Sequence, residues 1–240
     1  MHVRREPDRG TRSRLIRLIS PVIPIGDDNT YRRTVPVVTY ALIALNVLVF
    51  LGELNQPDPD NFLVQWGAVP VRISHGQGLE TLVTSMFLHA GWWHLLGNML
   101  FLFVFGDNVE DAFGHVRYLL FYLACGVLAG FTQVLLAPDA SLPGVGASGA
   151  ISGVLAAYLI MFGTNPVRVL LGFFPLVVPA YVMIGVWIVL QFFNGLANVA
   201  QTAQSGGVAY GAHIGGFVGG IVLTLVLRPS SRRRTRGRLR

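Results

Sequence analysis

Residues 118–227 contain only two charged side chains, Asp139 and Arg168, and this scarcity of charge constrains the fold more than any other feature. About one residue in four is charged in a typical soluble domain, whereas 12% of this chain is charged and 52% is hydrophobic. That balance excludes a disordered chain and argues against a soluble globular enzyme. It predicts a membrane protein that lies in the lipid bilayer.

The net charge of +6 comes from the two ends of the chain, where fifteen of the 18 basic residues lie, all of them arginine. Clustered arginine also suits nucleic acid, but no nucleic-acid motif accompanies it, so no such partner is expected. Arginine beside apolar spans marks the cytoplasmic side of a membrane. We therefore expect Arg-rich cytoplasmic tails at 1–34 and 229–240 around a membrane core at 35–228.

The apolar segments predict an all-α fold, a polytopic bundle of six transmembrane helices. Two cytoplasmic tails require an even number of spans, and segments that are apolar on all sides are typical of helices rather than barrel strands. A span needs about 20 residues, which the shorter segments reach with their flanking turns. The six segments are Val37–Gly52, Trp93–Phe105, Tyr118–Ala137, Ala147–Phe162, Val177–Phe193 and Val208–Leu227.

The loops between these helices mostly follow the same charge rule. The outer loops, expected at Glu53–Gly91, Pro138–Gly146 and Asn194–Gly207, contain one arginine against five acids. The inner loops are expected at Gly106–Arg117, which is acidic, and at Asn165–Leu176. The long first outer loop is rich in tryptophan, so we expect it to lie in the membrane interface.

Four uncharged polar side chains interrupt the predicted spans at a similar depth. His94 and Asn98 are four residues apart at the outer start of the second helix, so they share one face. Ser148 lies near the outer start of the fourth helix, and His213 lies about 8 Å below the outer end of the sixth. Polar groups are costly in a membrane, so their convergence calls for an explanation.

Glycines surround Ser148 and His213 in the sequence. Gly149 and Gly153, Gly215 and Gly219, and Gly216 and Gly220 are pairs four residues apart. Small residues at this spacing let two membrane helices approach closely. If the fourth and sixth helices pack through these faces, Ser148 and His213 come within hydrogen-bonding reach.

A serine bonded to a histidine is an activated nucleophile, because the imidazole accepts the hydroxyl proton and later returns it to the leaving group. No acid lies in the spans beside them, so the pattern indicates a catalytic dyad of Ser148 and His213. The oxyanion donors expected are the Ser148 backbone N–H, His94 and Asn98. Each residue alone is more simply a helix cap or a packing residue, but together they favour a functional site.

Other chemistries lack the residues that they need. His89 and His94 are five residues apart, which is not one helical face, and no metal site is expected. Intramembrane aspartyl chemistry needs two acids within spans, and the soluble hydrolase Gly-x-Ser-x-Gly turn is absent.

The chain resembles the rhomboid family of intramembrane serine proteases. The matching stretches are His89-Ala90-Gly91-Trp92-Trp93-His94-Leu95-Leu96-Gly97-Asn98, Gly106-x-x-x-Glu110-x-x-x-Gly114, Gly146-Ala147-Ser148-Gly149 and Ala212-His213-Ile214-Gly215-Gly216, in the family's order. The resemblance implies a six-helix core with cytoplasmic termini, in a bacterial plasma membrane. It also implies cleavage of single-span membrane proteins near the outer face, without a cofactor or metal.

The same resemblance assigns roles to individual positions. Ser148 and His213 correspond to the nucleophile and general base, and His94 and Asn98 to oxyanion contributors, while Glu110, Gly149 and Gly216 correspond to structural residues. One position departs from the pattern. Some family members have an aromatic residue one turn after the serine that packs on the histidine, where this chain has Ser152. The histidine here would then be oriented by another group, such as Tyr210.

Two alternatives to a protease stay open from the sequence. An inactive rhomboid-like protein would bind transmembrane helices without cutting them, which the intact Ser148 and His213 argue against. A small transporter would have polar residues along a path through the membrane, whereas polarity in these spans stops in the outer third.

Overall fold

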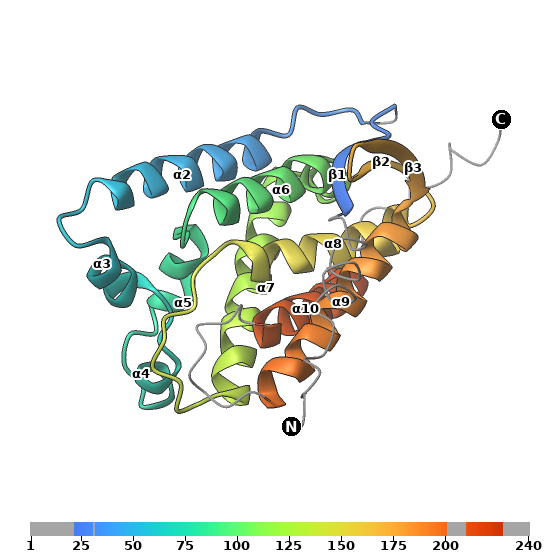
Figure 1. The fold of residues 1–240 in the computed structure, drawn as a ribbon. Helices are drawn as coiled ribbons and strands as arrows, with labels where there is room; N and C mark the ends of the chain where they lie inside the picture. The colour runs from blue at the N-terminus through green and yellow to red at the C-terminus, as the bar shows by residue number, and fades with distance from the viewer. Residues whose placement is uncertain (1–21, 31, 201–209, 228–240) are drawn as a thin grey trace, which may run out of the picture.

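The computed structural model describes residues 22–30, 32–200 and 210–227, and within them the chain is a helical bundle with a small sheet at one end (Figure 1). The sheet lies at the end of the bundle opposite α3 and α4 (Figure 1). The long helices are α2 (Val37–Leu54), α6 (Trp92–Phe113), α7 (His115–Leu136), α8 (Ser148–Phe162), α9 (Ala180–Ala200) and α10 (Tyr210–Leu227).

Three of the described helices, α2, α7 and α10, are long and apolar enough to cross a membrane. A fourth span results if α5 (Thr81–Thr84) and η1 (Ser85–Phe87) form one broken segment with α6. The chain bends by 94° between η1 and α6. Helix α8 and the Ala180–Gln191 part of α9 are apolar but shorter. The described residues thus contain three to four candidate spans, which fits a multi-pass membrane protein, and the six spans that the sequence predicted are not confirmed.

The prediction of an inner loop at Gly106–Arg117 is wrong, because α6 continues to Phe113 and α7 begins at His115. Only Gly114 separates them, with a φ of +81° that glycine adopts without strain. The acids of this stretch are buried in the helix rather than exposed in a loop. Their carboxylates bind the segment before α2 and the first turn of α2, so hydrogen bonds within the protein replace those to solvent.

Glu110 is one of these buried acids, and its partners lie at the start of α2 and on α7. Its carboxylate accepts hydrogen bonds from the Val38 and Thr39 backbone N–H groups at 2.9 and 2.7 Å, from the Thr39 hydroxyl at 2.6 Å, and pairs with His115 at 2.5 Å. Val38 and Thr39 belong to the first turn of α2, whose N–H groups have no partner within the helix. Glu110 therefore caps α2 from a neighbouring helix.

A three-stranded antiparallel sheet was not predicted and departs from the all-α expectation. Strands β1 (Val22–Asp27), β2 (Pro166–Leu171) and β3 (Phe174–Pro179) lie in this order. The hairpin of β2 and β3 occupies the expected inner loop Asn165–Leu176 and continues to Pro179, so the helix expected from Val177 begins only at Ala180. Strand β1 lies within the expected N-terminal tail. A two-residue turn at Gly172 and Phe173 closes the hairpin, with Gly172 at a φ of +63°.

The expected outer loop Glu53–Gly91 is structured by short helices, including α3 (Pro59–Trp66) and α4 (Pro70–Ser74) as well as α5 and η1. Ala68 in this segment forms an antiparallel bridge with Gly144, just before α8. The third expected outer loop, Asn194–Gly207, is helical as far as Ala200. The rest of that loop, residues 1–21 of the first tail and the tail at 229–240 lie outside the described residues.

Glycines join α7, α8 and α10 into the centre of the bundle. A Cβ at Gly220 would lie 2.5 Å from the Gly153 Cα, and one at Gly216 would overlap the Gly149 carbonyl oxygen. On the neighbouring face of α10, a Cβ at Gly219 would lie 2.8 Å from a Leu128 methyl on α7. The close approach expected from the glycine spacing is thus present between α8 and α10, and α7 shares it.

Candidate active site

Ser148 is the first residue of α8, and its side chain meets His213 from α10. The Ser148 Oγ lies 2.7 Å from the His213 Nε2, a normal hydrogen-bond distance. The glycine contact between α8 and α10 brings the two backbones close enough for this hydrogen bond to form. Two residues 65 positions apart in the sequence are therefore joined by helix packing.

The His213 ring is buried and has neighbours on several sides. Its Nδ1 lies 2.7 Å from the Gln191 Oε1, on α9. The Trp187 ring lies 5.9 Å away at 42°, and the Tyr210 ring lies 6.2 Å away, nearly perpendicular. Aromatic contacts thus come from α9 and α10, while the Ser152 hydroxyl donates to the Ser148 carbonyl at 2.6 Å.

Gln191 is the residue of this site that the sequence reasoning missed. A signal was present, because Gln191 is a lone amide in the otherwise apolar predicted span Val177–Phe193. Its helix position relative to His213 depends on how α9 packs, which no spacing in the sequence reveals.

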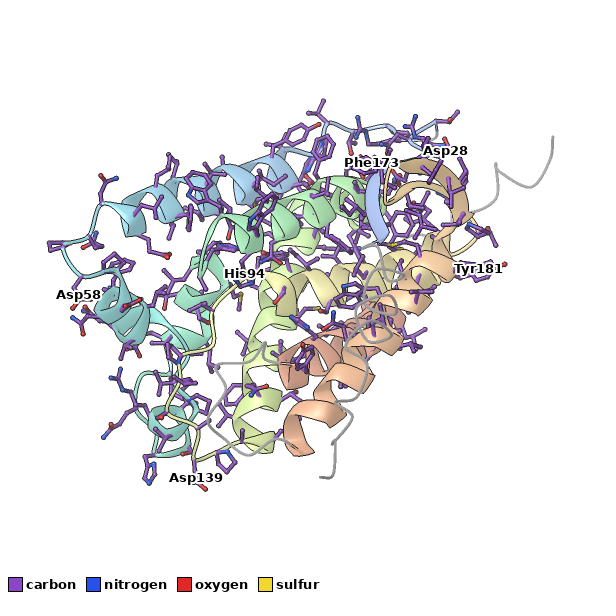
Figure 2. All side chains as sticks on the ribbon, in the orientation of Figure 1. Asp28, Asp58, His94, Asp139, Phe173 and Tyr181 are labelled. Carbon is purple, nitrogen blue, oxygen red and sulfur yellow. The ribbon has the colours of Figure 1, made fainter. Side chains whose placement is uncertain are left out.

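His94 and Asn98, from the first two turns of α6, lie against the chain that leads into Ser148. A Cβ at Gly146 would lie 2.7 Å from the His94 ring and 3.5 Å from the Asn98 Nδ2. Gly146 has a φ of +120°, so it suits both the turn and the close contact. Figure 2 shows His94 where α6 faces the beginning of α8.

Hydrogen-bond donors without a partner gather beside Ser148. The Asn98 Nδ2 is buried and bonds to nothing among the described residues. The first backbone N–H groups of α8 have no helical acceptor, and Ala147 before them has no side chain that caps. These donors suit an oxygen that acquires negative charge next to Ser148.

A small cavity of about 50 Å³ adjoins the serine. Its walls come from η1, α7, the start of α8 and Ala212, and they include Ser85 and Gln133. A water molecule needs roughly 10–15 Å³ of such space and several polar partners. The cavity is therefore large enough to admit water to the Ser148 side chain.

In the part of the chain that the structure describes, no three His, Cys, Asp or Glu side chains come together as metal ligands. His89 is fully buried with its ring 5.2 Å from that of His94, at 66°.

The chain is similar to proteins of a known family. A family model for the Rhomboid domain matches residues 76–230. The chain is 32% identical over 192 residues to rhomboid protease GluP of Bacillus subtilis, covering 79% of this chain and 35% of that protein. It is 30% identical to rhomboid protease AarA of Providencia stuartii, covering 74% of this chain and 68% of that protein.

A further relative is rhomboid protein 1, mitochondrial, of Saccharomyces cerevisiae, which is 30% identical over 78% of this chain. The chain covers 52% of that protein. It thus spans between about a third and two thirds of the length of these curated relatives.

Proposed function

Because this chain belongs to the rhomboid family, we propose that it is a serine-type intramembrane endopeptidase with Ser148 as nucleophile and His213 as general base. The observation that carries the proposal is the 2.7 Å contact between the Ser148 Oγ and the His213 Nε2. A neutral imidazole at this distance accepts the hydroxyl proton as the oxygen attacks a carbonyl carbon.

In the proposed reaction, Ser148 Oγ adds to the scissile carbonyl while its proton moves to His213 Nε2. The tetrahedral intermediate then expels the amine, which takes that proton, and leaves an acyl ester on Ser148. A water molecule next loses a proton to Nε2 and adds to the ester. Collapse of the second intermediate releases the new carboxyl end and returns the proton to Ser148.

The negative oxygen of both intermediates would be stabilised by donors that are already in place. Asn98 Nδ2 is a buried donor without a partner among the described residues, and the Ser148 backbone N–H begins a helix. We assign His94 to the same group because its ring packs on Gly146. Preorganised donors of this kind supply much of the rate acceleration in acyl transfer.

The proposed setting is a six-helix core with both Arg-rich tails in the cytoplasm of a bacterial cell and the site near the outer face of the plasma membrane. The supporting features are the arginine distribution and the shared depth of the four polar residues. The proposed substrates are single-span membrane proteins. Their helices must unwind locally, because a helical peptide carbonyl is already hydrogen-bonded.

Cleavage of a single-span protein in proteoliposomes tests this function. The wild-type protein should cut the substrate, Ser148→Ala should not, and Ser152→Ala, one turn further along α8, should cut it. Mass spectrometry of the products locates the cut, which we expect in the outer half of the substrate helix. Cleavage by Ser148→Ala at the wild-type rate would overturn the assignment, and binding without any cleavage by the wild-type protein would indicate an inactive member.

A further inference from the structure

Gln191 gives the catalytic histidine a partner that a serine–histidine dyad lacks. Its Oε1 lies 2.7 Å from His213 Nδ1, on the opposite side of the ring from Ser148. Gln191 comes from α9, whereas Ser148 and His213 come from α8 and α10. The three side chains therefore form a hydrogen-bonded chain across three helices.

The direction of this chain of hydrogen bonds follows from the chemistry of a neutral imidazole. One ring nitrogen carries a proton and donates, and the other accepts. For His213 to take the Ser148 proton, Nε2 must be the acceptor and Nδ1 must carry the hydrogen. An amide oxygen at Nδ1 accepts that hydrogen and so favours the tautomer that a general base requires.

The opposite orientation of the amide would have the opposite effect. If the Gln191 Nε2 group faced the ring, it would donate to His213 Nδ1 and place the proton on His213 Nε2. That nitrogen would then donate to the Ser148 hydroxyl and could not act as the base. The orientation of one amide group thus decides whether the pair is poised for reaction.

An amide suits this position better than the acid of a serine–histidine–aspartate triad. A carboxylate in an apolar span is costly, whereas a neutral amide carries the same type of acceptor oxygen at a lower desolvation cost. The rings of Trp187 and Tyr210 flank the imidazole, but rings cannot select a tautomer as an oxygen at Nδ1 does.

We propose that Gln191 is a positioning residue that holds His213 in the Nδ1-protonated tautomer and fixes its ring toward Ser148. This inference rests on the proposed protease function, because it assigns His213 the role of general base. It adds a third member, a neutral one, to the catalytic pair.

The test compares Gln191 variants in the proteoliposome cleavage assay. Gln191→Leu keeps the approximate size but removes the acceptor, and we expect kcat to fall by about tenfold, the effect of one hydrogen bond, with little change in KM. Gln191→Glu keeps an acceptor oxygen and should restore most of kcat. Val189→Ala, at an exposed position of the same helix, is the matched control and should behave as the wild type.

A purely structural role predicts a different pattern, in which Leu is tolerated or in which Leu and Glu lower stability and rate together. Thermal unfolding of each variant in detergent separates these cases. If Gln191→Leu does not fold, Gln191→Met, which is unbranched, replaces it. A kcat for the foldable apolar variant equal to that of the wild type would overturn the inference.

A second measurement needs no activity. The ¹⁵N chemical shifts of the two His213 ring nitrogens, measured on the wild-type protein, report which nitrogen carries the hydrogen. Protonated Nδ1 and unprotonated Nε2 are expected, and the reverse pair would overturn the inference even if the protein cleaves its substrate. If instead the wild-type protein cleaves nothing, the proposed function fails while the shifts still determine the tautomer.

Discussion

At the scale of single residues, the site is built from uncharged side chains. In the proposed mechanism, Ser148, His213, Asn98 and Gln191 supply a nucleophile, a base and polar partners, and none of these four side chains is a carboxylate. A site made of a hydroxyl, two amides and a neutral imidazole costs less to bury in an apolar protein than a site that contains an ionised carboxylate. Charge develops only during the reaction, next to donors that are already oriented.

Asn98 allows the oxyanion role to be tested separately from the nucleophile. Replacing Asn98 by Ala should lower kcat by about 10²–10³-fold, because one preorganised donor contributes roughly 2.7–4 kcal/mol to the transition state. KM should change little. Asn55→Ala, at the exposed end of α2, is the control and should leave both parameters unchanged. Equal kcat values for Asn98→Ala and the wild type would remove Asn98 from the oxyanion site.

The sequence was sufficient to select Ser148, His213, His94 and Asn98, because polar residues stand out in an apolar span and helical spacing gives their depth. The structure places these residues near one another, while their catalytic roles stay predictions. Gln191 was missed although it also stands out, because depth alone does not reveal which face of α9 meets His213. That relation depends on side-chain packing between helices that are distant in sequence.

At the scale of elements, the contact between α8 and α10 determines whether the catalytic pair can meet. Gly153 and Gly220 bring the two backbones together, and no side chain separates them. The histidine and serine are carried by the same two helices. Any residue that widens this contact should lengthen the Ser148–His213 hydrogen bond.

Gly220→Ala tests this coupling of packing and activity. Its Cβ would lie 2.5 Å from the Gly153 Cα, so the helices must move apart, at a cost of about 1–3 kcal/mol for overpacking. We expect a lower unfolding temperature and a lower rate of cleavage together. Gly97→Ala on α6, where an added Cβ meets nothing within 4 Å, should leave both unchanged or slightly raise stability. A fully active and stable Gly220→Ala variant would refute the coupling.

Glu110 is predicted to stabilise α2 rather than to take part in the chemistry. Glu110→Ala leaves the N–H groups of Val38 and Thr39 without their acceptor, which should lower the free energy of unfolding by about 3 kcal/mol. Chemical or thermal unfolding in detergent measures this loss. Glu80→Ala, at an exposed position before α5, should have almost no effect. Equal losses in the two variants would contradict the capping role.

The elements that the sequence could not predict are those whose partners are remote. The acids at the end of α6 led to the prediction of a loop. Their hydrogen-bond partners lie near residues 32–39, before and within the start of α2, and are not evident from the local sequence. Strand β2 was predicted as a loop, because the strand that it pairs with, β1, lies more than 130 residues earlier in the sequence. Local periodicity carries no information about such contacts.

At the scale of the whole molecule, the end of the bundle that carries the sheet has a polar layer that joins the N-terminal segment to the helices. Asp27 of β1 accepts hydrogen bonds from Tyr158 on α8, at 2.6 Å, and from Asn108 on α6. Arg32 forms an ion pair with Asp107 at 2.5 Å. The segment predicted as part of a tail is thus, in its described residues, attached to the bundle.

This layer makes overall stability depend on pH. Burial raises the pKa of Asp27 to about 6, although its hydrogen bond from Tyr158 opposes the rise. A carboxyl group whose pKa is higher in the folded state stabilises the fold when protonated, and this contribution is lost as pH rises from about 4 through about 6. Above that range, burial of the charged group opposes folding.

Asp27→Asn removes this titration and keeps an acceptor for Tyr158. Relative to the wild type, its free energy of unfolding should therefore increase between pH 4 and pH 7, by up to about 3 kcal/mol. Parallel unfolding experiments across this range measure the difference between the two proteins. A difference that is constant with pH would show that Asp27 does not titrate in this way.

The scarcity of charge in the apolar helices also explains why their few polar residues point to the proposed function. The account's central claim is that Ser148 is a nucleophile activated by His213. The most direct measurement is the reaction of the purified protein with a serine-reactive fluorophosphonate, followed by mass spectrometry of the adduct. We predict one adduct, on Ser148, that is lost in His213→Ala and kept in Ser152→Ala. An adduct on another residue, or undiminished labelling of Ser148 in His213→Ala, would contradict the claim.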